Sequence, residues 1–92
     1  MVIHELKILK KFAGEVRSKK KSFEVRKNDR NFKVGDFVRF NVLNDKGEII
    51  TFATDEHLYK IDYILTHDDF PEGIKEGYVV FSITEHSLVK TD

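Results

Sequence analysis

Short stretches of alternating apolar and polar residues recur along the chain, a pattern typical of half-buried β-strands. Six strands are predicted, at residues 2–9, 22–27, 37–43, 48–53, 58–65 and 78–84. Phe12, Ala13 and Val16 instead follow a helical spacing, which predicts one short helix over 10–18. The pattern therefore indicates an α+β, mostly β fold: a small, mostly antiparallel β-barrel of about six strands with one short N-terminal helix.

Turn-forming residues separate the predicted elements. Lys19–Lys21 is expected to be the exit turn of the helix, and Val34-Gly35-Asp36 a tight turn into the third strand. Asn44-Asp45-Lys46-Gly47 is a strong hairpin signal between the third and fourth strands. Residues 66–77 hold the only Pro and two Gly, so they are predicted to form a loop. From Glu85 onward we expect a polar, frayed tail.

Alternation also predicts which side chains share a face. In the second predicted strand, Phe23 and Val25 are expected to face the core, with Ser22, Glu24 and Arg26 on the opposite, polar face. Because Glu24 and Arg26 are two residues apart on a strand, they can pair with each other or bracket one ligand. One face of the fifth predicted strand is expected to carry Tyr59, Ile61, Tyr63 and Leu65.

The composition excludes several classes of protein. Ninety-two residues predict a single domain over 1–92, and the absence of Cys excludes a disulfide framework, a Cys-ligated zinc site and a thiol nucleophile. No apolar run approaches the roughly 20 residues of a membrane span, and the N-terminus lacks the pattern of a secretory signal. His4 and His67 have no metal-ligand spacing. We therefore expect a cytoplasmic chain with no cofactor, no metal and no membrane partner.

The formal net charge is zero, yet the charges are unevenly distributed. Residues 1–46 hold 13 Lys and Arg against 6 Asp and Glu, a net charge of +7, whereas residues 47–92 hold 3 against 10, a net charge of −7. The basic excess is concentrated in residues 17–33, with 8 against 2. This asymmetry favours a localised basic surface suited to a polyanion, with a merely solvated Lys-rich turn as the alternative.

The most basic segment also carries a motif. Lys-Lys-Lys-Ser-Phe-Glu-Val-Arg at Lys19–Arg26 resembles the ASCH superfamily, whose members have a PUA-like barrel. More narrowly, the chain resembles a small ASCH-related domain of unknown function common in phage, prophage and plasmid genes. That resemblance rests on four blocks in the expected order: His4–Ile8, Phe23–Arg30, Val34–Asp36 and Gly77–Val80. Two features depart from the family pattern, since Lys19 stands where a glycine is usual and residues 46–57 lack the expected hairpin.

The resemblance implies a cleft beside the barrel, lined by the Lys-rich turn and the strand after it. It implies that this cleft binds RNA, or a nucleotide or another nucleic acid. The candidate contacts are Lys19, Lys20, Lys21, Glu24, Arg26, Lys27 and Arg30. The arginines offer planar forks for phosphate or base edges, the lysines act as point charges, and Glu24 can accept a hydrogen bond from the amino group of a base. Tyr63 or Tyr78 can stack on a base if either is exposed at the cleft.

Other interpretations of the same residues stay open. Glu24 and Arg26 can form a structural ion pair in the barrel mouth. Some ASCH-like proteins resemble amidohydrolases that remove an acyl group from a modified cytidine with a Lys, a Thr and a Glu. Lys21 matches that Lys, and Ser22 offers a hydroxyl, but Glu24 stands where the Thr is expected. A third hypothesis is an interaction protein of a mobile element that uses the acidic cluster Asp68, Asp69, Glu72 and Glu76.

Overall fold

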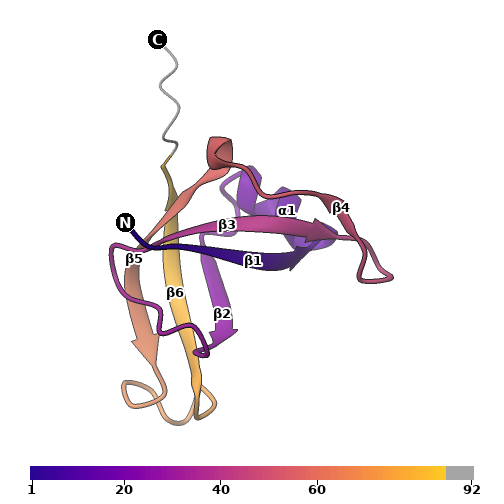
Figure 1. Cartoon of the computed structure of the whole chain (residues 1–92). Helices are drawn as coiled ribbons and strands as arrows, with labels where there is room; N and C mark the ends of the chain where they lie inside the picture. Colours follow the sequence, from indigo (N-terminus) through magenta and orange to yellow (C-terminus); the bar gives the residue numbers. More distant parts are fainter. Residues whose placement is uncertain (87–92) are drawn as a thin grey trace.

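The computed structural model describes residues 1–86, which fold as one six-stranded sheet with one α-helix (Figure 1). In chain order the elements are β1 (Ile3–Leu9), α1 (Lys10–Arg17), β2 (Phe23–Lys27), β3 (Phe37–Leu43), β4 (Ile49–Thr51), the 3-10 helix η1 (Asp55–His57), β5 (Tyr59–Thr66) and β6 (Tyr78–Glu85). The predicted α+β, mostly β class is confirmed. Glu85 ends β6, and the remainder of the predicted tail lies largely outside the described residues.

The sheet is folded on itself and is open along one edge. Its strand order is β1-β3-β5-β6-β2, with β4 paired to β3; the β1–β3 pair is parallel and the other pairs are antiparallel. β3 and β5 share two residue pairs, Phe37 with Lys60 and Val38 with Tyr59. In Figure 1, β1 and β3 lie across the view, whereas β5, β6 and β2 are upright in it. Within residues 1–86, β1 and β2 remain unpaired ends, so backbone pairing does not close the expected barrel.

The core lies inside the fold of the sheet. Val38, Ile61 and Phe81 are fully buried there, and Val16 is the residue that α1 buries against them. Burying such side chains is the main favourable term in folding. An eight-residue helix is too short to be stable alone, so α1 depends on this packing. No helix in residues 1–86 is both long enough and apolar enough to cross a membrane.

A bulge in β5 overturns the predicted face of that strand. The pairing of β5 with β6 shifts register between Ile61 and Tyr63. A bulge inserts an extra residue and so reverses the alternation beyond it. Tyr63 is therefore 63 % exposed, and Ile64 packs against the core in its place. The prediction that Tyr63 shares the buried face of Tyr59 and Ile61 was wrong.

β2 has the predicted alternation with the faces exchanged. Phe23 and Val25 are 46 % and 57 % exposed, whereas Glu24 is only 4 % exposed. The prediction that the two apolar side chains face the core was wrong. Glu24 and Arg26 do share a face, as predicted, but that face points into the fold of the sheet, where a carboxylate needs charged partners.

Two of the sequence blocks that carry the family resemblance meet in the structure. His4 in β1 is buried, and its Nε2 lies 2.8 Å from Oδ2 of Asp36, which also accepts the backbone N–H of Lys33 at 3.1 Å. Gly35 has a φ of +94°, a conformation that glycine adopts without strain. His4 and Asp36 therefore anchor the start of β1 to the turn before β3, which is a structural role.

Candidate functional site

A hollow of about 610 Å³ lies where the sheet is open, between β1, α1 and β2. We call it the seam cleft. It is lined by Lys7, Ile8, Leu9, Phe12, Glu15, Lys20, Lys21, Phe23, Glu24, Val25 and Arg26. Four of these side chains are cationic and two are acidic, so the cleft has an excess of positive charge. All of them come from the basic first half of the chain, which the fold gathers around one opening.

A buried carboxylate organises the charges of the seam cleft. Glu24 Oε1 accepts hydrogen bonds from Nε and Nη2 of Arg26 at 3.1 and 2.8 Å, and Glu24 Oε2 pairs with Nζ of Lys21. The triad carries a net charge of +1. Both carboxylate oxygens are engaged, so Glu24 positions the two cations in this structure.

Arg26 also joins the two unpaired ends of the sheet. Its Nη2 donates a hydrogen bond of 2.7 Å to the backbone carbonyl of Lys7 in β1. This contact spans the opening that backbone pairing leaves between β1 and β2. The guanidinium carbon lies 6.0 Å from the ring centroid of Phe40, within range of a cation–π contact. Arg26 is therefore held in one orientation by contacts with β1, β2 and β3.

Two aromatic rings border the ammonium group of Lys21. Its Nζ lies 5.6 Å from the ring centroid of Phe12 and 5.0 Å from that of Phe23, and it donates a 2.7 Å hydrogen bond to the Phe23 carbonyl. Phe12 is 40 % exposed, so its ring is accessible at the cleft. The cleft therefore combines fixed cations with accessible aromatic surface. The alternation in β2 predicted burial for Phe23, and no sequence pattern indicated that the ring of Phe12 would border the cleft.

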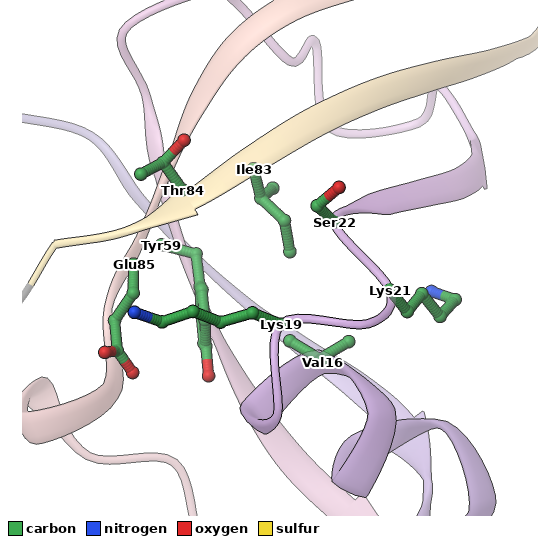
Figure 2. Close-up of a pocket in the computed structure, with 8 residues that line it drawn as sticks. All are labelled: Val16, Lys19, Lys21, Ser22, Tyr59, Ile83, Thr84 and Glu85. Carbon is green, nitrogen blue, oxygen red and sulfur yellow. The ribbon is translucent and has the colours of Figure 1, made fainter.

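A second hollow, of about 260 Å³, lies on the other side of the Lys-rich turn (Figure 2). We call it the tyrosine pocket. It is lined by Val16, Lys19, Lys21, Ser22, Tyr59, Ile83, Thr84 and Glu85. Burial, together with the nearby Glu85 carboxylate, raises the pKa of the Tyr59 phenol above its ordinary value, and Arg17 opposes this shift. The phenol is therefore a neutral hydroxyl at physiological pH.

The sequence between β1 and β6 matches a known family. Residues 3–83 match the family model described as a domain of unknown function, DUF3850. The chain belongs to the DUF3850 family. No curated protein matches the chain. The DUF3850 match contains every residue of the seam cleft and all but Thr84 and Glu85 of the tyrosine pocket. The expectation of a domain of unknown function is confirmed.

The structure of this DUF3850 chain separates the seven predicted contacts into three groups. Lys20, Lys21, Glu24 and Arg26 line the seam cleft. Lys19 lines the tyrosine pocket instead, where Figure 2 shows its side chain extended toward Glu85. Lys27 and Arg30 are exposed and line neither hollow.

The residues of the amidohydrolase hypothesis are divided between the two hollows. Ser22 lines the tyrosine pocket and Glu24 lines the seam cleft. Lys21 lines both hollows, and Figure 2 shows its side chain turned away from Ser22. The Lys21 ammonium instead donates to Glu24 and to the Phe23 carbonyl. In this arrangement the hydrogen-bond partners of Lys21 lie in the seam cleft, apart from the Ser22 hydroxyl with which the hypothesis pairs it.

The acidic cluster lies in the loop between β5 and β6. Asp69 accepts hydrogen bonds from the backbone N–H and the hydroxyl of Thr66 at 2.9 and 3.0 Å, and these bonds hold the pKa of Asp69 below its ordinary value. Asp69 therefore stabilises the turn that follows β5. Across residues 1–86, the His, Asp and Glu side chains form no group of three that could hold a metal ion.

The turn after α1 forces a lysine into a conformation that favours glycine. Lys19 has a φ of +68°, and its N–H donates to the Val16 carbonyl at 3.1 Å. This geometry ends helices well when the residue is glycine, and costs a residue with a Cβ about 1 kcal/mol. We expect Lys19→Gly to raise the free energy of unfolding by about 1 kcal/mol, measured by urea denaturation. Lys20→Gly, outside the positive-φ region, is the control and gives no gain; equal effects would contradict the assignment of strain to Lys19.

Proposed function

We propose that this chain is an RNA-binding domain of the ASCH superfamily, with a PUA-like fold, and that RNA binds in the seam cleft. The carrying observation is that the open edge of the sheet brings Lys20, Lys21 and Arg26 beside the accessible rings of Phe12 and Phe23. Cations next to aromatic rings are the combination that single-stranded nucleic acid recognises. The family resemblance supports the same class, and with it a phage or prophage origin and a role in the cytoplasm.

Each part of the seam cleft has a role in this proposal. Phe12 and Phe23 supply ring faces on which bases stack, a contact that tolerates any base. Within residues 1–86, Arg26 makes its hydrogen bonds through Nε and Nη2, so Nη1 remains for a phosphate. Lys20 adds an exposed point charge. Glu24 acts as a positioning residue, because it fixes Lys21 and Arg26 at the cleft floor.

The dimensions favour a single strand over a duplex. A hollow of about 610 Å³ is within the range of pockets that enclose one small ligand. Stacking on Phe12 or Phe23 also requires a base whose face is free, and paired bases inside a helix do not offer one. We therefore propose unpaired RNA as the ligand.

The test compares matched pairs of variants by fluorescence anisotropy, with a labelled mixed-sequence single-stranded RNA at low salt. Lys20→Ala and Lys27→Ala remove the same charge, inside and outside the seam cleft. Phe12→Ala and Phe52→Ala remove an exposed ring, inside and outside it. We expect Phe12→Ala to weaken binding by about tenfold and Phe52→Ala to leave it unchanged, because stacking on an aromatic ring contributes about 1–3 kcal/mol per base.

Two results would contradict the proposed function. One is the absence of binding at low salt. The other is an equal loss of RNA affinity for the variant inside the cleft and its matched variant outside it, which would indicate nonspecific attraction to the protein surface. These variants leave the Lys21–Glu24–Arg26 triad intact, so a loss of binding cannot be attributed to an unpaired buried charge.

A further inference from the structure

The Lys-rich turn separates the two hollows, and its side chains alternate between them. Lys19 and Ser22 line the tyrosine pocket, Lys20 lines the seam cleft, and Lys21 contributes to both. Figure 2 shows the turn as the boundary of the tyrosine pocket, with Lys19 extended over the pocket and Lys21 pointing to the other side. The turn is therefore a narrow ridge between the two hollows, with lysine ammonium groups on both of its sides.

The tyrosine pocket has the features of a site for one planar group. Val16, Ile83 and the ring of Tyr59 give it an apolar floor, and the hydroxyl of Ser22 and the ammonium of Lys19 stand at its edge. Its volume of about 260 Å³ is less than half that of the seam cleft. An apolar floor with a few convergent polar groups is the usual form of a small-molecule site. No residue of this pocket other than Lys21 takes part in the function proposed above.

The strained backbone of Lys19 points to the same pocket. A glycine would end α1 there without strain, yet the chain places a lysine at a φ of +68°. Residues held in sparsely populated conformations cluster at functional sites, and the conformation of Lys19 directs its ammonium over the tyrosine pocket. The strain and the pocket are independent observations, and both indicate a ligand group on that side of the turn.

We propose that two successive nucleotides of one strand straddle the turn, with one base in the seam cleft and the other in the tyrosine pocket. The phosphate that joins them crosses the ridge, where Lys19, Lys20 and Lys21 surround it with positive charge. The minimal ligand is then a dinucleotide. This inference rests on the proposed function of the seam cleft and assigns a separate role to the tyrosine pocket.

The test measures the dissociation constants of a nucleoside 5′-monophosphate, a dinucleotide and a trinucleotide of the same base, by calorimetry at one salt concentration. We expect the dinucleotide to bind about tenfold or more tightly than the mononucleotide, because the second base gains its own site. The trinucleotide is expected to add less than about threefold, since it adds only charge outside both hollows.

Lys19→Gly separates the two sites. It removes the ammonium of the tyrosine pocket, and because glycine suits this backbone, a lost fold cannot explain a lost affinity. We expect it to weaken dinucleotide binding more than mononucleotide binding, so that the difference in affinity between the two ligands becomes smaller. Lys20→Ala changes the seam-cleft side of the turn. It should lower the affinity for the mononucleotide and for the dinucleotide by the same factor, so that the difference between the two affinities is retained.

The outcomes distinguish this inference from the one on which it rests. If the mononucleotide binds and the dinucleotide binds no tighter, the two-nucleotide site is wrong and the seam cleft alone is the site. The same conclusion follows if the Lys19→Gly variant shows the same increase in affinity from mononucleotide to dinucleotide as the unmodified protein. If no oligonucleotide of any length binds at low salt, the proposed function itself is wrong.

Discussion

Replacing Glu24 with alanine is expected to lower the free energy of unfolding by about 3–5 kcal/mol. The carboxylate is 4 % exposed and is the shared partner of Lys21 and Arg26, so its loss leaves two partly buried cations facing each other. A domain of this size has a total stability of about 5–15 kcal/mol, so this one change removes a large part of it. Chemical denaturation followed by circular dichroism measures the loss.

An exposed ion pair provides the control for this prediction. Asp55 pairs with Arg39 at the surface, and Asp55→Ala removes a carboxylate of the same chemistry. We expect a cost of about 0–1 kcal/mol there, because water solvates the remaining charge. A loss below about 1 kcal/mol for Glu24→Ala would show that water can solvate the Lys21 and Arg26 cations in the seam cleft at little cost. That result would contradict the organising role of the triad.

The affinity for RNA is expected to fall roughly twentyfold when the salt concentration rises from about 50 mM to about 200 mM. Each phosphate neutralised on a single strand contributes a slope of about −0.7 to the logarithmic salt dependence, and our proposal places three of the four cations of the seam cleft, Lys20, Lys21 and Arg26, beside the RNA. With three phosphate contacts, a fourfold rise in salt concentration then lowers the affinity roughly twentyfold. Anisotropy titrations at several salt concentrations measure the slope.

The salt slope also identifies which cations contact phosphate. Lys20→Ala should make the slope shallower by about 0.7, whereas Lys27→Ala should leave it unchanged because Lys27 does not line the cleft. A slope near zero in the unmodified protein would contradict phosphate contact in the seam cleft. Binding would then depend on stacking alone.

Local patterns predicted the elements of this domain well. The six strands and the short helix were readable from alternation and helical spacing, because these periods depend on backbone geometry alone. The shared face of Glu24 and Arg26 followed from the same rule. The Lys-rich turn was correctly placed between α1 and β2, since turns depend on a few adjacent residues.

Which face of each strand is buried depends on how the strands pair in the folded sheet. Phe23 and Val25 are exposed because β2 lies at the open end of the sheet, where the inward face meets two cations that neutralise Glu24. Tyr63 is exposed because of a bulge whose position depends on the pairing of β5 with β6. Neither feature is encoded in the period of a single strand.

The same division applies to the candidate site. The residues alone showed that positive charge is concentrated between 17 and 33, because charge is a property of composition. The strand order then placed β1 and β2 at the two ends of one folded sheet and left an opening between them. That opening gathers Lys20, Lys21 and Arg26 beside Phe12 and Phe23, and sends Lys19 to the opposite side of the turn. Long-range strand pairing makes this arrangement, and periodicity within one segment carries no information about it.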